Sequence, residues 1–472
     1  MMKTIEIHRI WRNKGWFLFT SQWILWITVL VVNVSCDDFV DIPAPKDELV
    51  SPSVFTDDES ANAVVRGMYS QMASSLGFAG GYYNSVTVTS SLAADELFSF
   101  RPPNAFFENE LNPDDQAIER YLWNEAYQYI YTCNVILEQL ALSDQLSAEV
   151  VQQLEGEARF IRAFCYFYLT NLFGDVPLHL VSDYEANATA ERAPKDQVYQ
   201  QIIEDLRLAK EFLAMDYSWS EGERVRPNKW AAIALLARVY LYTENWEQAQ
   251  QMASAVLSNS RLYELEPDLT AVFLKNSKEA IWQLRPVRPR LNTLEAFWFI
   301  PVSSRPTSVG ITDTLLSAFS TEDQRLTQWI GSVSDGEQTW YYPHKFKVRI
   351  SSELIEYSMV IRLAELYLIR AEASAHLNDF SAAQQDINRI RSRAGLEDIT
   401  TTDLQQLLDA IYSERQRELF TEWGHRWLDL KRTQRADQIL GGKTGWEPTD
   451  VLYPIPLNEL LRNTQLEQNP GY

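Results

Sequence analysis

Aromatic side chains stand beside amide or guanidinium side chains in three irregular stretches of the sequence. Such pairs suit the capture of a sugar, because the apolar C–H face of a sugar ring stacks on a flat aromatic ring while its hydroxyl groups need polar partners. An aromatic residue in a long loop can also cover an apolar cluster of its own. The candidate ligand-binding residues are Tyr82, Tyr83 and Asn84, after a pair of glycines; Arg101, Asn104, Phe106 and Phe107, around Pro102-Pro103; and Trp298, Arg305, Trp340, Tyr341 and Tyr342, in the later half of the chain.

Covalent chemistry has weaker support in the sequence. A glycosidase needs two opposed carboxylates in a cleft that raises the pKa of one of them. Among the 64 acidic residues, the pair Asp95-Glu96 is one such candidate, but no local sequence pattern distinguishes this pair from acidic residues on the surface. No GxSxG elbow and no phosphate-cradling glycine loop occurs. We expect a binding protein without catalytic residues, and a secreted hydrolase is the rival hypothesis.

Metal and disulfide chemistry are also unsupported. The chain has three cysteines and five histidines, with no CxxC pair and no Cys/His cluster typical of a zinc site. Cys133 and Cys165 fall within apolar helical patterns, which favours buried thiols over a disulfide. We therefore expect no metal and no cofactor.

Several charged residues lie within helical patterns and are expected to hold helices together. Arg162 and Asp175 are expected to satisfy helix ends and to pair with neighbours, since a helix C-terminus favours cations and leaves carbonyl groups unpaired. Arg362, Glu365 and Glu372 recur at three- and seven-residue spacing, which suits ion pairs between packed helices.

A basic cluster stands out against the acidic background at Arg285, Arg288 and Arg290. The first interpretation is a solvated or internally paired cluster. The second is that its guanidinium groups receive the carboxylates of an acidic glycan, since arginine binds carboxylates through two hydrogen bonds at once.

The scaffold that must position these residues is predicted from a repeat. Residues 231–257 have the period of two amphipathic helices joined by a tight turn, with alanines where the helices approach closely. The pattern returns at 370–390, where Phe380 matches Trp246, Ala371 matches Ala237 and Ala383 matches Ala249. Such a hairpin is typical of tetratricopeptide-like repeats, which cannot cover their apolar face alone and stack on neighbours.

The other elements complete a mainly α fold with long inserted loops and a few short strands. Helices are predicted at 59–74, 119–137, 148–173, 195–213 and 404–423, and helical periodicity also returns at Met359. Strands are predicted at 279–284 and in part of 295–301. We divide this part of the chain into a helical region at 59–260, a loop-rich region at 261–358 that is the expected ligand face, and a second helical region with its tail at 359–472.

The first residues resemble a targeting segment. A basic start and an apolar run at 23–32 end at Asn33-Val34-Ser35-Cys36, which resembles a bacterial lipoprotein signal over 1–35, with Cys36 as the lipidated residue. Position 33 is Asn where such signals usually carry Leu, and a plain N-terminal membrane anchor is the alternative. Residues 36–58 are acidic and Pro-rich, which favours a tether. The net charge of −22 argues against nucleic acid as a partner.

Four longer motifs, taken together and in order, resemble the SusD/RagB family of Bacteroidetes surface lipoproteins. They are RFIRAFCYFYLTNLFGDVPL at 159–178, MVIRLAELYLIRAEA at 359–373, ERQRELFTEWGHRWLDLKR at 414–432 and YPIPLNELLRNTQLEQNPGY at 453–472. CDDFVDIPAP at 36–45 and LLSAFSTEDQR at 315–325 also fit. The resemblance covers nearly the whole chain after the targeting segment.

The resemblance implies a SusD-like tetratricopeptide-type scaffold anchored by lipid on the outer face of the outer membrane. Members capture oligosaccharides, or in some cases peptides, and serve as a lid on a SusC-like TonB-dependent transporter. The family motifs are scaffold residues, so they do not identify the ligand. Two alternatives to oligosaccharide capture stay open: peptide binding by the same architecture, and a tetratricopeptide scaffold that binds only proteins.

Overall fold

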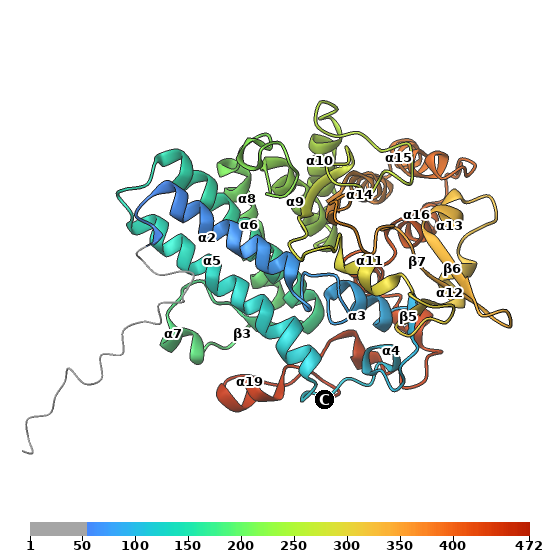
Figure 1. Ribbon diagram of the computed structural model, residues 1–472, viewed down its shortest axis with the longest axis horizontal. Helices are drawn as coiled ribbons and strands as arrows, with labels where there is room; N and C mark the ends of the chain where they lie inside the picture. The colour runs from blue at the N-terminus through green and yellow to red at the C-terminus, as the bar shows by residue number, and fades with distance from the viewer. Residues whose placement is uncertain (1–53) are drawn as a thin grey trace, which may run out of the picture. The chain divides into compact units, whose positions relative to one another are not determined.

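The computed structural model describes residues 54–472 (Figure 1). The chain divides into two units, residues 1–49 and 50–472, and all described residues belong to the second. The predicted signal 1–35, Cys36 and most of the predicted tether lie outside the described residues. Among residues 54–472, no helix combines the length and the apolar character needed to cross a bilayer.

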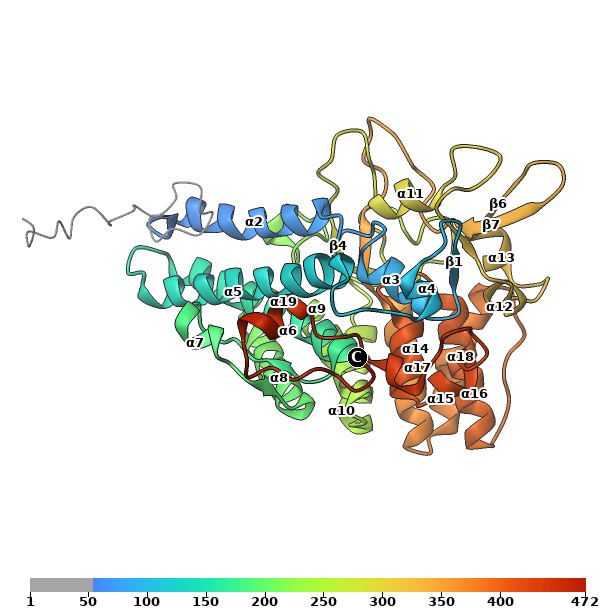
Figure 2. The same cartoon turned by 90° about the horizontal axis from the view of Figure 1, so that it is seen from below.

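Long helices packed side by side form the body of this unit. Helix α6 contacts α5 and α8, α8 contacts α9, α9 contacts α10, α10 contacts α14, and α14 contacts α15 and α16. Figure 2 shows the later helices of this series lying beside one another. Their bounds are α2 (Asp58–Ser74), α5 (Glu125–Leu142), α6 (Ala148–Phe173), α8 (Lys195–Phe212), α9 (Lys229–Tyr242), α10 (Trp246–Leu257), α14 (Leu363–His376), α15 (Phe380–Arg393) and α16 (Leu404–Leu419).

The predicted repeat is confirmed down to its turn. The α9–α10 and α14–α15 hairpins both turn through a residue with left-handed backbone, Glu244 (φ 55°) and its counterpart Asn378 (φ 62°). The next residue in each copy, Asn245 or Asp379, caps the second helix by accepting a hydrogen bond from a backbone N–H three positions on. The matched alanines are fully buried, and the two hairpins meet through α10 and α14. A hairpin with an apolar face on each side stacks on its copy because neither can cover that face alone.

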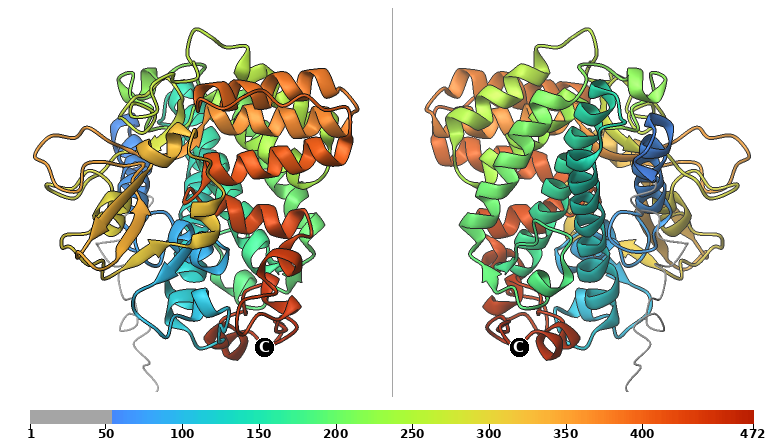
Figure 3. Two further views of the ribbon diagram at one scale, coloured as in Figure 1. Left: turned by 90° about the vertical axis from the view of Figure 1, so that its right-hand side faces the viewer. Right: turned by 90° about the vertical axis from the view of Figure 1, so that its left-hand side faces the viewer.

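Shorter helices and two-stranded antiparallel sheets connect the long helices. The strands pair as β1 (Leu97–Ser99) with β5 (Val309–Ile311), β2 (Val176–Pro177) with β3 (Arg192–Ala193), β4 (Ala280–Leu284) with β8 (Ser358–Arg362), and β6 (Ile330–Ser334) with β7 (Thr339–Pro343). The short helices are α3 (Val86–Ala93), α4 (Ala105–Glu108), η3 (Ala117–Asn124), α7 (Tyr184–Ala188), η4 (Ser218–Ser220), α11 (Leu294–Phe299), α12 (Asp313–Ser317), α13 (Gln324–Gln328), α17 (His425–Arg432), α18 (Ala436–Leu440), η5 (Pro448–Val451) and α19 (Leu457–Arg462). Figure 3 shows the segment that carries β6 and β7 on one side and α14 to α16 on another.

Three local predictions were wrong. The strand expected within 295–301 is the helix α11, because Thr293 accepts a hydrogen bond from Ala296 N–H at 3.0 Å and so starts a helix that β-favouring side chains alone do not predict. The helix expected from Met359 begins at Leu363, because residues 358–362 form strand β8 and pair with β4. A fully buried strand lacks the alternation of apolar and polar residues that would identify it in the sequence. The helix expected to reach 423 ends at Leu419, and Thr421 and Trp423 adopt left-handed backbone.

The apolar core is rich in aromatic rings centred on α6. The ring of Phe164 lies 5.2 Å from that of Trp282 on β4 and 5.1 Å from that of Trp423, in edge-to-face geometry. Cys133 and Cys165 are free and buried in this core, as predicted. Burial raises the pKa of the Cys133 thiol to about 12, which keeps the thiol protonated and unreactive.

The charged residues expected to hold helices together are confirmed as ion pairs or caps. Arg162 binds Asp205 of α8 at 2.7 Å, and Asp175 accepts a hydrogen bond from the Lys195 N–H at 2.8 Å, where α8 begins. Three further pairs join elements that are distant in sequence, namely Glu365 with Arg238 at 2.6 Å, Glu372 with Arg432 at 2.5 Å, and Arg362 with Glu422 at 2.7 Å.

Arg362 belongs to a larger buried network centred on the Glu418 carboxylate of α16. Arg362 and Arg325 donate to Glu418 at 2.6 and 2.9 Å, and Arg393 also pairs with it. Burial by itself raises the pKa of Glu418, but the three guanidinium groups hold it well below the usual range. Glu418 is therefore ionised at neutral pH although its side chain is fully buried.

We predict that Glu418→Gln lowers the free energy of unfolding by about 3–5 kcal/mol, because it leaves buried guanidinium groups without their shared counter-charge. Urea denaturation followed by circular dichroism measures the effect. Glu264→Gln is the matched control, since Glu264 pairs with Lys278 on an exposed surface and its loss is expected to leave the midpoint unchanged. Equal midpoints for the two variants would contradict the structural role of the network.

Candidate ligand-binding site

Three of the predicted ligand-binding residues gather into one aromatic group, although they come from separate parts of the chain. The Trp298 ring lies 4.9 Å from the ring of Tyr82 and 5.5 Å from the ring of Tyr83, and the two tyrosine rings are 5.0 Å apart. Tyr83 is 39% exposed, and Tyr82 and Trp298 are half-buried. The group therefore offers ring faces to solvent while its other faces rest on the protein.

The backbone that presents the tyrosines is held tightly. Gly81 has left-handed backbone (φ 76°), and a Cβ there would lie 2.2 Å from the side chain of Glu295. Directly after the tyrosines, Ser85 begins helix α3 and its N–H donates to the Tyr82 carbonyl at 2.8 Å. Only glycine combines this backbone with so close an approach, so the turn that exposes Tyr82 and Tyr83 depends on it.

Trp298 is positioned by α11 and by the strand that follows it. The Ser308 hydroxyl donates to the Trp298 carbonyl at 3.1 Å, and the Ser308 carbonyl accepts a hydrogen bond from the Phe100 N–H at 3.0 Å. The Nε1 atom of Trp298 is buried without a hydrogen-bond partner among residues 54–472. These bonds fix the backbone of Trp298, and the β1–β5 pair lies next to it.

A second group of predicted residues lies around β7. The Arg305 guanidinium lies 5.5 Å from the centroid of the Trp340 ring and forms a 2.8 Å ion pair with Asp335. Phe100 lies 6.4 Å from Trp340 and connects this group to Trp298 through Ser308. Trp340 is 8% exposed whereas the Arg305 side chain is 68% exposed. In this group the arginine, more than the indole, is available to a ligand.

The remaining residues near this region are more tightly packed. On β7, Trp340 and Tyr342 share one face and Tyr341 points to the other, where it packs on the core. Tyr342 lies over Gly331 of β6, since a Cβ at that glycine would meet its ring at 2.3 Å. The Arg101 guanidinium donates to the Thr307 carbonyl at 2.8 Å and so holds the loop before β5.

Four other predicted residues add no ring to either group, although the Asn84 side chain lies beside Tyr83. Asn84 is buried beside Ser85, and Asn104 caps α4 by accepting from the Phe107 N–H at 3.0 Å. Phe106 is buried 5.6 Å from the ring of Tyr453, and Phe107 lies under the Lys443 ammonium. The contacts of Asn104, Phe106 and Phe107 hold α4 against the body of the protein.

Sequence reasoning missed three residues that border the aromatic group. Tyr121 of η3 lies 6.5 Å from Tyr83, Phe297 lies 6.0 Å from Tyr82, and the Arg349 guanidinium stacks 4.3 Å above Phe297. Phe297 adjoins Trp298 in the sequence, which was a usable signal. Tyr121 and Arg349 had none, because a helix and an irregular loop bring them here from other parts of the chain.

The carboxylates considered for catalysis are engaged in internal contacts. Asp95 forms an ion pair with Arg426 at 2.6 Å, and Glu96 is 1% exposed and accepts hydrogen bonds from the Ser91 hydroxyl and the Thr421 N–H. Asp95 and Glu96 are both buried and adjacent in the sequence, so a sugar cannot lie between their carboxylates as catalysis would need. Among the described residues, no group of three or more His, Cys, Asp or Glu side chains is arranged to hold a metal ion.

The basic cluster has partners within the protein. Arg285 pairs with Glu223 at 3.4 Å, and the Arg288 guanidinium donates to the Ser74 carbonyl at 2.6 Å, while both remain exposed. The internally paired interpretation is confirmed for these two residues. Binding of an acidic glycan by this cluster stays a prediction. It would be removed if the protein binds neutral but not uronate-containing oligosaccharides, and if Arg288→Ala leaves that binding unchanged.

The buried carboxyl group of Glu295 lies against Gly81, in the turn that carries Tyr82 and Tyr83. Glu295 is 4% exposed, Ser358 of β8 donates to its Oε1, and its Oε2 has no hydrogen-bond partner in the described part of the chain. Burial raises the pKa of Glu295 from 4.5 to about 7. Because the folded protein binds this proton more tightly than the unfolded chain, the group makes the fold less stable as the pH rises from 4.5 through 7.

We predict that Glu295→Gln removes this loss of stability. At pH 4 the variant and the parent are expected to unfold at similar temperatures, and at pH 8 the variant gains on the order of 3 kcal/mol relative to the parent. Thermal unfolding between pH 4 and pH 8 measures the difference. Glu337→Gln, on the exposed β6–β7 turn, is the control, and parallel pH profiles for Glu295→Gln and the parent would refute the assignment.

Comparisons with known proteins match both halves of the chain. A family model described as "Starch-binding associating with outer membrane" matches residues 38–241, and the SusD family model matches residues 317–472. SusD-like protein P2 of Formosa agariphila is 27% identical, over 95% of this chain and 99% of its own length.

Solved structures share the fold over the same extent. A SusD superfamily protein from Parabacteroides distasonis has a TM-score of 0.75 at 25% identity, covering 88% of this chain and 99% of its own. A laminarin-binding SusD-like protein has a TM-score of 0.73 at 23% identity, with the same coverage. The two family models and these relatives span both helical regions and the loops between them, and the chain belongs to the SusD/RagB family.

Proposed function

We propose that this protein is a cell-surface lipoprotein that binds oligosaccharides and delivers them to a SusC-like TonB-dependent outer-membrane transporter. The observation that carries the proposal is the meeting of Tyr82, Tyr83 and Trp298, from two segments distant in sequence, with ring faces left accessible. A relative of the same fold is described as laminarin-binding, and the family model of the N-terminal half as starch-binding. Both descriptions concern glucose polymers.

The geometry of the aromatic group suits a glycan chain. The Tyr82 and Trp298 rings meet at 71° and the Tyr83 and Trp298 rings at 40°, so their faces are inclined to one another. Successive sugar units of a chain present their C–H faces at different angles, which such a set of rings can follow. Arg101 and Arg305 lie on segments that Phe100 and Ser308 join to Trp298, and their guanidinium groups offer donors for hydroxyl groups. The proposed mechanism is binding and hand-over, with no covalent step.

Because these rings are held by the turn at Gly81 and by α11, little side-chain freedom is lost when a ligand binds. Ordering of loose side chains costs about 0.5–1.5 kcal/mol for each one that is immobilised. A peptide is the alternative ligand for the same face. Binding of peptides but of no oligosaccharide would select it.

We predict that Trp298→Ala weakens oligosaccharide binding by about 1–2 kcal/mol or more, a factor of roughly 5 to 30, because it removes the ring shared by both tyrosines. Calorimetry against maltoheptaose, laminarihexaose and a peptide panel measures the loss. Trp246→Ala removes a half-buried tryptophan that stacks on His376 in the helical frame and is the matched control. Equal affinities of the two variants would refute the proposed site.

We predict that the protein is attached to the outer membrane through Cys36. Cys36→Ala is expected to abolish labelling by a fatty-acid analogue and to release the protein from the membrane fraction, whereas Cys133→Ala changes neither because that thiol is buried. Metabolic labelling and cell fractionation check this.

Cross-linking of the native protein in intact cells tests the proposed partner. The expected product is a covalent complex with a large outer-membrane transporter.

A further inference from the structure

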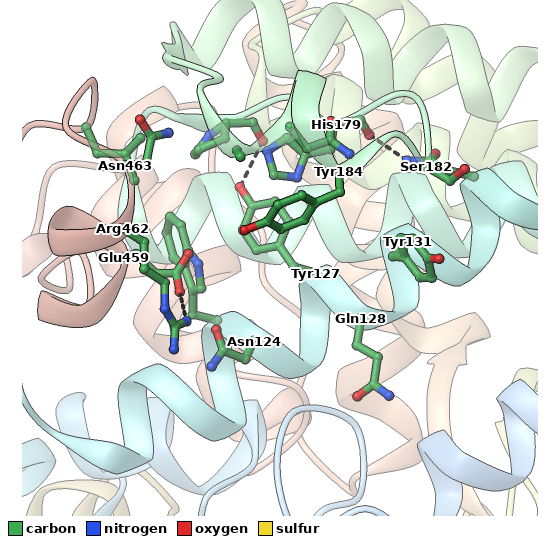
Figure 4. Close-up of a pocket in the computed structure, with 16 residues that line it drawn as sticks. Asn124, Tyr127, Gln128, Tyr131, His179, Ser182, Tyr184, Glu459, Arg462 and Asn463 are labelled. Atoms are coloured by element: carbon green, nitrogen blue, oxygen red, sulfur yellow. Dashed lines mark hydrogen bonds and ion pairs between the residues drawn. The ribbon is translucent and has the colours of Figure 1, made fainter. Parts of the chain in front are cut away.

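A pocket lies apart from the aromatic group and contains none of its residues. It has a volume of about 410 Å³ and is bounded by α5, the segment around α7, and α19. Figure 4 shows Gln128 and Tyr131 on α5, Tyr184 on the α7 segment, and Glu459 with Arg462 on α19. The volume is within the range of small-molecule pockets.

Aromatic rings form much of its wall. The Tyr127 ring lies 5.0 Å from that of Trp123 and 5.1 Å from that of His179, and its hydroxyl is fixed by a 2.8 Å hydrogen bond to the Pro177 carbonyl. Tyr184 is 82% exposed and Tyr131 is 47% exposed. Two exposed tyrosines that line one pocket offer ring faces to an entering molecule.

The polar groups in the pocket fall into two classes. Asn134, Asn187 and Asn463 hold neighbouring loops through hydrogen bonds to backbone carbonyls. By contrast, Asn124 and Gln128 have no side-chain hydrogen bond within the described protein, and the His179 Nε2 is buried without a partner. Burial lowers the pKa of His179 to about 4, so its ring is neutral at physiological pH. These three side chains provide amide and imidazole groups that can donate or accept hydrogen bonds.

The pocket carries no net charge. Its charged lining residues are Glu459 and Arg462, which pair with one another at 2.9 Å. A charged ligand would have to break this pair or be buried without a counter-charge. A neutral molecule that combines apolar faces with several hydroxyl groups satisfies both the rings and the unpaired amides.

We propose that this pocket is a second glycan subsite that binds a neutral sugar unit, with Tyr127 and Tyr184 against the ring faces and Asn124, Gln128 and His179 at the hydroxyl groups. The inference rests on the proposed function, since it assumes that glycans are the ligands of this protein. A long glycan would then be held at two separate places, and binding at both raises the overall affinity above that of either alone.

The test compares the full chain with three variants by calorimetry and saturation-transfer NMR, using maltoheptaose and laminarihexaose as probes. The Tyr184→Ala/Gln128→Ala double variant changes exposed side chains only. It is expected to lose one binding event, or to bind at least 10-fold more weakly, and Trp298→Ala is expected to retain that event. Leu461→Ala, an exposed residue of α19 that does not line the pocket, is the control and binds as the parent does.

Two results separate the pocket from the aromatic group. If Trp298→Ala abolishes all binding and the double variant binds as the parent does, the second subsite is refuted and the proposed function stands. If the double variant abolishes binding and Trp298→Ala does not, the pocket is the glycan site and the aromatic group is not. Absence of any Tyr184- and Gln128-dependent binding of either probe overturns the inference.

Discussion

The structure depends on compensation of buried charge around Glu418. This carboxylate on α16 is shared by Arg325, Arg362 and Arg393, and Arg362 in turn binds Glu279 at the start of β4. Fully buried ions need partners inside the protein, because water no longer solvates them. The partners come from α13 in the loop-rich region, from strand β8 and from helix α15. The network therefore fastens the irregular middle of the chain to the helical stack.

That attachment explains how loops can carry a precise site. The stack of hairpins is rigid because each pair buries the apolar face of the next. β8 leads directly into α14, pairs with β4, and through Ser358 supports Glu295 beneath the aromatic group. Loop aromatics on such a base keep their positions, so binding does not have to order them first. The regular helices thus supply stability, and the irregular segments supply recognition.

Much of the frame was predictable from the sequence because its signals are local. A helix repeats its apolar positions within a few residues, and the two copies of the hairpin share the same small residues, turn and cap, as Asn245 and Asp379 show. The sequence predicted that Arg162 and Glu365 form ion pairs, because charged groups within apolar helices need partners. It did not identify those partners. Where local signals compete, as at α11 and β8, prediction from sequence chose the wrong element.

The sequence by itself determined the repeat, the mainly helical class, the family and a set of aromatic loop residues from which the site was drawn. Only the tertiary structure decided which of them meet: Trp298 joins Tyr82 and Tyr83, whereas Phe106 is packed against Tyr453. It also revealed the pocket of Tyr127 and Tyr184, whose walls come from three distant segments. The reason is physical. Periodicity is set by neighbours along the chain, but exposure and contact between distant residues are set by how whole elements pack.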